Sequence, residues 1–136
     1  MFEVLFWPIF TAGVANVILG FIWYNPKVFG TIWMRAANVS PEAMERGKKK
    51  MPIMAFVGFL AAMVIAYVLN HFGIAWGVYD WIGAVELGIW AWVGFTAPVL
   101  LGSVLWEMKS LKYYAINVGY LFVSLIAMSL TILYFT

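Results

Sequence analysis

The sequence predicts an all-α integral membrane protein with four transmembrane helices. Apolar residues make up 65% of the 136 residues and charged residues only 10%, whereas a soluble domain is typically about half apolar and a quarter charged. A soluble fold of this size does not bury so much apolar surface, so lipid must be the solvent for much of it. The eight Lys and Arg residues lie in only two of the loops between apolar segments.

Four apolar segments have the roughly 20 residues that a helix needs to cross the bilayer core. They are residues 2–24, 52–72, 81–106 and 113–135, within a single domain of residues 1–136. Every backbone group in lipid must be paired inside its own segment, so these segments are predicted to be a bundle of four helices. A β-barrel is excluded because the apolar runs are continuous and the chain is too short for eight strands. No basic residue precedes the first segment, so we expect a span and not a cleaved signal.

Residues at the segment ends predict where the helices begin and stop. Asp80 stands where an N-cap of the third span belongs, and Gly73 follows the second span as a C-cap. Asn25-Pro26 and Ser40-Pro41 each pair a capping residue with proline at the first helical position.

The basic residues predict the orientation. Six of the eight lie between positions 27 and 50, and the other two are Lys109 and Lys112. Neither terminus nor the 73–80 loop holds any. Basic loops stay in the cytoplasm. We therefore expect a multi-pass protein of the cell membrane with both termini outside and both basic loops cytoplasmic.

The cytoplasmic loop, residues 25–51, is expected to be structured. Lys27, Thr31, Arg35 and Asn38 recur at helical spacing, and apolar residues fill the opposite face. This pattern predicts a short amphipathic helix at about 26–35 that lies in the inner interface. Three successive lysines follow, and they either contact anionic lipid head groups or serve only as topology determinants: Lys48, Lys49 and Lys50.

The sequence resembles one known family. Residues 23–34 read WYNPKVFGTIWM, the third span carries WAWVGFTAP, and the last opens with INVGY. This order is similar to the prokaryotic membrane family catalogued as domain of unknown function 1761, which has a WY-x-P-x-x-FG-x-x-W signature after its first span. The resemblance covers nearly the whole chain and implies a fold of four helices. It implies no activity, so no catalytic residues are carried over.

Glu86 is the one acidic residue expected inside the third span. It follows Asp80 by six residues, so it lies about 9 Å inward at 1.5 Å per residue. A carboxyl group at this depth is costly and is a candidate functional site. It either handles a proton or ligand, or joins two helices as a hydrogen-bonded acid, or reaches the outer interface. We expect it to face protein or a cavity, with a partner from another span or a neighbouring subunit.

Two asparagines complete the candidate intramembrane polar site. Asn16 and Asn117 both fall in the inner third of their spans, where they can bond across a helix interface. A purely structural role is the favoured interpretation. Small residues near them, and a stripe of Gly58, Ala62 and Ala66, predict close approach of the helices.

The third span carries a candidate apolar cavity lining. Pro98 removes a backbone hydrogen bond and should kink this helix. Trp90 and Trp92 lie deeper than an interfacial aromatic belt requires. These three residues either line an apolar cavity or only pack helices together.

Several functional classes have no support in the sequence. There is no cysteine, which excludes disulfides, thiolate metal sites and cysteine nucleophiles. The sequence has a single histidine and shows no catalytic spacing, phosphate-binding loop or metal-binding motif. It therefore gives no reason to expect a catalytic residue, a metal or a cofactor. The basic cluster is short and lacks a nucleic-acid-binding motif, so membrane lipids are the expected partners.

Three functional hypotheses follow. The first is non-enzymatic binding or transport of a small or apolar ligand, in a homo-oligomer or alone, with Glu86 as the polar group. The second is an accessory or structural subunit, or a lipid-interacting scaffold, of a larger membrane complex. The third, an intramembrane enzyme acting on a lipid, requires a catalytic pair that the sequence does not offer.

Overall fold

The computed structural model describes residues 2–136, and all regular structure in that range is helical. Four helical stretches are long and apolar enough to cross a membrane: Phe6–Trp23, Pro41–Ala75, Trp81–Leu105 and Leu111–Phe135. This confirms the predicted all-α membrane protein with four transmembrane helices.

The elements follow one another with short connections. Helix α1 spans Phe6–Trp23, and a π-helical turn, η1 (Pro26–Gly30), runs directly into α2 (Thr31–Ala37). Helix α3 spans Pro41–Ala75. The third span is divided into three helices: α4 (Trp81–Phe95), α5 (Ala97–Leu100) and α6 (Gly102–Leu105). The last span is a single helix, α7 (Leu111–Phe135).

The predicted caps start the helices as expected. The side chains of Asn25, Ser40 and Asp80 each accept a hydrogen bond from a backbone N–H two or three residues later, at 2.9, 3.1 and 2.8 Å. These bonds satisfy backbone donors that the first turn of a helix leaves free. The segment 26–37 is accordingly helical, as the polar stripe predicts.

Helix α3 differs from the sequence prediction at both ends. It begins at Pro41 and continues through Pro52, so the second half of the basic loop extends the helix beyond the apolar segment. Gly73 is not its C-cap, because the helix continues to Ala75. The left-handed turn is made by Gly77, at a φ of 67°, a conformation that glycine adopts without steric cost.

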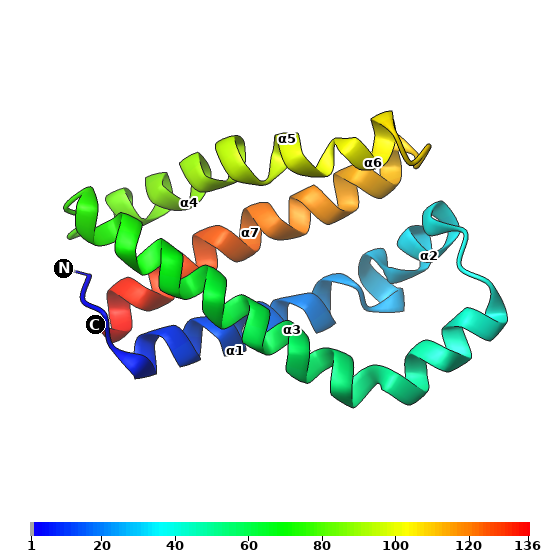
Figure 1. Ribbon diagram of the computed structural model, residues 1–136, viewed down its shortest axis with the longest axis horizontal. Coiled ribbons are helices and arrows are strands. Elements are labelled where there is room, and N and C mark those ends of the chain that lie inside the picture. Colours follow the sequence, from blue (N-terminus) through cyan, green and yellow to red (C-terminus); the bar gives the residue numbers. More distant parts are fainter. Residues whose placement is uncertain (1) are drawn as a thin grey trace.

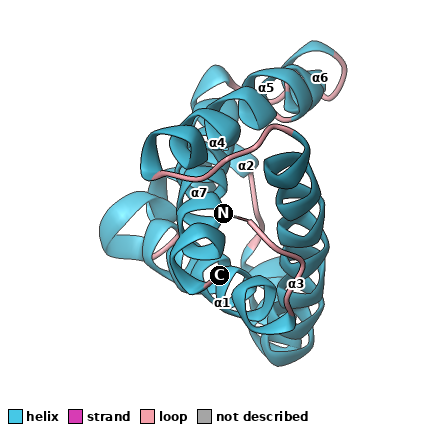
Figure 2. Cartoon of the chain, turned by 90° about the vertical axis from the view of Figure 1, so that its left-hand side faces the viewer, coloured by secondary structure: helices cyan, strands magenta, loops and turns pink. Residues whose placement is uncertain are grey.

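The helices are arranged around α7. Helix α7 lies between α1 and the α4–α6 span and packs against both, whereas α3 crosses α1 and reaches α4 and α7 only near its end (Figure 1). The view along the molecule shows α3 to one side of the other three spans (Figure 2). Both chain termini lie at the same end of the bundle, and the connections that carry the basic residues lie at the other end (Figure 1).

Small residues allow the close approaches between spans. Ala62 and Ala66 of α3 are buried where it crosses α1, and a Cβ on Gly13 of α1 would lie 2.9 Å from a side-chain carbon of Met63. Helices α4 and α7 approach equally closely, since a Cβ on Gly88 would lie 2.8 Å from the Cα of Ile126. Small residues at helix interfaces are the usual means of packing spans in lipid.

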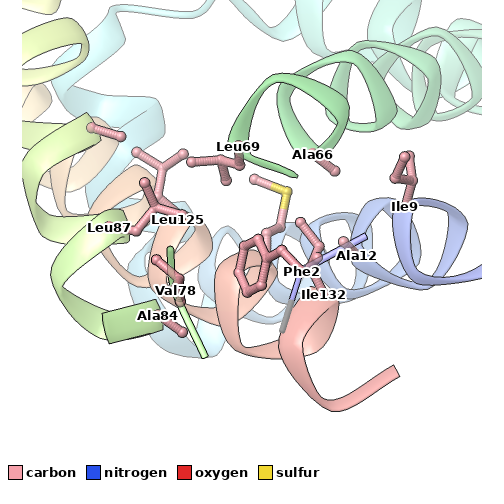
Figure 3. Packing of buried hydrophobic residues seen from close by; sticks show 12 residues of the cluster. Phe2, Ile9, Ala12, Ala66, Leu69, Val78, Ala84, Leu87, Leu125 and Ile132 are labelled. Atoms are coloured by element: carbon pink, nitrogen blue, oxygen red, sulfur yellow. The ribbon is translucent and has the colours of Figure 1, made fainter. Parts of the chain in front are cut away.

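The core lies at the end of the bundle that holds the termini. Phe2, only 2% exposed, inserts its ring between helices at this end, close to Ala12 and Ile132 (Figure 3). Its ring occupies the position where Gly73 has no side chain. Gly73 therefore makes room for the Phe2 ring, and its position near the end of the apolar segment does not mark a C-cap.

Candidate functional site

The predicted polar residues of α1 and α7 form a hydrogen-bonded seam between these helices. The Asn16 Oδ1 atom accepts hydrogen bonds from the hydroxyl groups of Tyr120, at 2.9 Å, and Ser124. The Tyr120 hydroxyl also lies 2.8 Å from the backbone oxygen of Asn16. Ser124 is fully buried, so the amide provides the acceptor that a buried hydroxyl needs.

Asn117 makes the matching contact one level nearer the basic loops. Its Oδ1 atom accepts a hydrogen bond from the Tyr24 hydroxyl at 2.6 Å. Asn16 and Asn117 therefore do not bond to each other; each is held by a tyrosine of the opposite helix. The two tyrosine rings, Tyr24 and Tyr120, meet edge to face with centroids 5.4 Å apart. The amide oxygens are occupied by protein donors, which is the behaviour of groups that join helices.

The signature residues 23–34 build the corner where the chain leaves α1. The Trp23 indole N–H donates to the backbone oxygen of Ile116 at 3.0 Å, and its ring centroid lies 4.7 Å from that of Phe29. A Cβ added to Gly30 would overlap the backbone oxygen of Tyr24. Trp33 stacks on Tyr113 with ring centroids 6.2 Å apart. Residues 23–34 of this chain thus form a corner that packs onto α7.

Glu86 lies on the outward face of α4. Its side chain is exposed, and no residue in the described range 2–136 gives it a hydrogen bond or salt bridge. It lines an open cleft of about 690 Å³ together with Trp90, Gly94 and the turn at Gly77–Asp80. The other three spans of the chain do not supply a partner for Glu86, so a neighbouring subunit and the outer interface are the alternatives that stay open.

Glu86 is also separate from the asparagine seam. Asn16 and Asn117 contact α7 and α1, whereas Glu86 faces away from the bundle on α4. The structure therefore divides the candidate polar site into a seam that joins helices and a free carboxyl group on the surface.

The predicted cavity lining is also divided. The Trp92 indole N–H donates to the backbone oxygen of Val118 at 2.8 Å, so Trp92 holds α4 to α7. Trp90 is 61% exposed on the outward face. The two residues are two positions apart, which places them on different sides of a helix. Trp92 therefore packs helices together, which is one of the two alternatives, whereas Trp90 lines the open cleft beside Glu86.

Pro98 nevertheless marks a break in the third span. Helix α4 ends at Phe95, and Pro98 stands in the first turn of the short helix α5. Thr96 at the junction has φ −119° and ψ −61°, outside ordinary helical geometry. The predicted interruption of this helix is therefore present.

An apolar cleft opens beside this break, between α3, the α4–α5 junction and α7. Its volume is about 530 Å³. Helix α3 diverges from α4–α6 away from the end of the bundle that holds the termini (Figure 1). Thr96 is the one lining residue with a polar side chain, and the others include Val68, Phe72, Phe95, Val99 and Leu125. Sequence reasoning missed this cleft because it depends on the crossing angle of α3.

The three lysines of the basic loop lie on the part of α3 that extends beyond the apolar segment. Lys48, Lys49 and Lys50 are exposed, and the Lys48 Nζ atom lies 3.5 Å from a carboxyl oxygen of Glu45. Their contact with lipid head groups stays a prediction.

Comparisons with known proteins give one match. A family model described as Protein of unknown function (DUF1761) matches residues 7–133, which confirms the suspected resemblance. No curated protein and no solved structure matches the chain.

Proposed function

Because that match spans residues 7–133, the chain belongs to the DUF1761 family, and we propose that it binds a small apolar ligand within the membrane without catalysing a reaction. The apolar cleft between α3, α4–α5 and α7 carries this proposal. Ligand sites in proteins are typically clefts of about 300–1,000 Å³ with mainly apolar walls. The cleft has a volume of about 530 Å³, and all but one of its lining residues are apolar.

The broken third span adds to this support. Thr96 lies at the junction of α4 and α5 and also lines the cleft. Broken helices in membrane proteins often border substrate sites, because the interruption frees backbone groups and allows the halves to move separately. A ligand in this cleft would contact Thr96 at the break in the span.

The test is binding of a pyrene-labelled fatty acid to the purified protein in detergent. Val99 lines the cleft and is 70% exposed, so Val99→Trp fills the cleft without disturbing the core. We expect the variant to bind roughly tenfold more weakly, since each buried methylene contributes about 0.8 kcal/mol and the indole displaces at least two.

Val57→Trp is the matched control. Val57 is 57% exposed on α3 and lies outside the cleft. Equal binding by both tryptophan variants and the unaltered protein would show that the fatty acid binds outside this cleft, and would contradict the proposal.

We also propose an orientation for this multi-pass membrane protein. Both termini face outward and both basic loops face the cytoplasm, because all eight Lys and Arg residues lie in those loops. The cleft lined by Glu86 then lies toward the outer side.

A second candidate role is that of a structural subunit that associates with another copy of itself. The free carboxyl group of Glu86 favours this role. A carboxylic acid facing acyl chains lacks a hydrogen-bond partner, which costs on the order of 1–3 kcal/mol even when it is protonated. A second copy packed on the outward face of α4 would supply the missing partner.

A further inference from the structure

A second cleft lies at the end of the bundle that holds the basic loops. It has a volume of about 610 Å³ and is formed by the corner after α1, by α2 and by the beginning of α7. Its apolar walls include Trp23, Phe29, Ile32 and Ile116, and its polar residues are Arg35, Ser110 and Lys112. It shares no lining residue with the apolar cleft of the proposed function.

The floor of this cleft is fixed by the surrounding structure. The Trp23 indole is bonded to the backbone of α7, and a Cβ on Gly119 would lie 3.3 Å from its ring. Phe29 packs against the same indole, with ring centroids 4.7 Å apart. The apolar floor is therefore preorganised and does not depend on a ligand to form.

Lys109 holds the two walls together. Its Nζ atom lies 3.3 Å from the backbone oxygen of Ala37 at the end of α2 and 5.5 Å from the centre of the Tyr113 ring. This lysine is therefore engaged with protein groups, and it ties α2 to the segment that precedes α7.

Arg35 and Lys112, the two basic residues that line the cleft, are not engaged as Lys109 is. Lys48 and Glu45 form the one salt bridge found among the described residues, so Arg35 and Lys112 have no acidic partner there. Two uncompensated positive charges beside an apolar floor, at the level where a span meets water, match an amphiphile with a negative head group.

We propose that this cleft binds one anionic phospholipid, with its phosphate between Arg35 and Lys112 and an acyl chain against Trp23 and Phe29. Arginine and lysine both donate to phosphate oxygens, and arginine does so with two parallel bonds. A zwitterionic phospholipid fits less well, because its own ammonium group adds a third positive charge. Free phosphate cannot use the apolar floor.

The test is native mass spectrometry of the full-length protein in detergent. The protein is titrated with phosphatidylglycerol and with phosphatidylcholine of identical acyl chains. We expect one phosphatidylglycerol per chain to be retained in preference to phosphatidylcholine. The double variant Arg35→Gln/Lys112→Gln should bind phosphatidylglycerol roughly thirtyfold more weakly, because each basic residue near the membrane surface contributes about a fivefold gain.

Two further variants separate this site from general attraction to charge. Lys49→Gln/Lys50→Gln also removes two positive charges, but from exposed positions on α3 outside the cleft, and should leave phosphatidylglycerol binding unchanged. Ala115→Leu narrows the cleft without altering charge and should weaken binding. Both double variants should keep the helical circular dichroism of the unaltered protein, because all four side chains are exposed.

Three outcomes would overturn the proposal. They are equal losses in the two double variants, equal retention of phosphatidylcholine, and displacement of the lipid by inorganic phosphate alone. The apolar cleft contains none of the residues changed here. Val99→Trp can therefore weaken fatty-acid binding even where the phospholipid test fails, so the two failures are distinguishable.

Discussion

Gly30, in the corner after α1, has no room for a side chain. It ends the π-helical turn η1, in which its N–H donates to the backbone oxygen of Asn25 at 2.9 Å. This wider turn brings the glycine against the carbonyl group of Tyr24, where no side chain fits. Single π-helical turns are rare and frequently mark functional regions, and this one contributes Phe29 to the floor of the proposed anionic lipid site.

The change Gly30→Ala should therefore destabilise the protein. The added Cβ overlaps the backbone oxygen of Tyr24, and overpacking of this kind costs about 1–3 kcal/mol. Gly47→Ala is the matched control, since a Cβ there meets nothing within 4 Å and Gly47 lies inside α3. The control substitution should raise the free energy of unfolding by about 0.5–1 kcal/mol, because alanine favours a helix more than glycine does. Thermal unfolding followed by circular dichroism measures both, and equal melting temperatures would contradict the argument.

At the same scale, the sequence identified the polar groups of the seam but not their partners. Asn16 and Asn117 stand out because amides are rare in apolar segments. Tyr24 and Tyr120 were not predictable as these partners, because periodicity places a residue along one helix and does not give the rotation of its neighbour. Only the packed structure shows that their hydroxyl groups reach across to the amides.

The helices themselves were predictable where local chemistry decides them. Cap residues located the beginnings of η1, α3 and α4, because a side-chain acceptor and a following proline or turn act within a few residues. The continuation of α3 through Pro52 was not predictable, since a proline in a helix is tolerated or not according to its surroundings. The divergence of α3, which forms the apolar cleft, is likewise a property of packing between helices.

Helix α4 presents an outward face that a cysteine experiment can test. Gly94 lies in the same cleft as Glu86, is exposed, and has open space where a side chain would be. The chain has no cysteine of its own. If α4 packs against α4 of a second copy about a twofold axis, Gly94→Cys should form a covalent dimer when membranes are oxidised.

Gly58→Cys is the control for this dimer, because Gly58 on α3 is also exposed and open. It should remain monomeric on a denaturing gel. A Gly94→Cys chain that stays monomeric, or equal dimer formation by both variants, would remove the support for self-association through α4.

The whole molecule has a strong asymmetry of charge along its length. Both termini and the Glu86 cleft lie at one end, and all eight Lys and Arg residues lie at the other end, in η1, α2, the beginnings of α3 and α7 and the loop before α7 (Figure 1). An even number of spans brings both termini to one side of the membrane by geometry alone. The charge pattern independently predicts that the two termini lie on the same side. The same asymmetry puts the proposed anionic lipid site and Lys48–Lys50 at the same end of the molecule.

The orientation is tested by accessibility in intact cells. Thr136→Cys, at the outer end, should react with a membrane-impermeant maleimide, whereas Lys48→Cys should react only after the cells are permeabilised. A reporter that is active only in the cytoplasm should be silent when fused after Thr136. The physical reason is that basic residues close to the spans are retained on the cytoplasmic side during insertion, and here no basic residue opposes that bias. An active cytoplasmic reporter at Thr136, or labelling of Lys48→Cys in intact cells, would reverse the orientation and move the Glu86 cleft to the inner side.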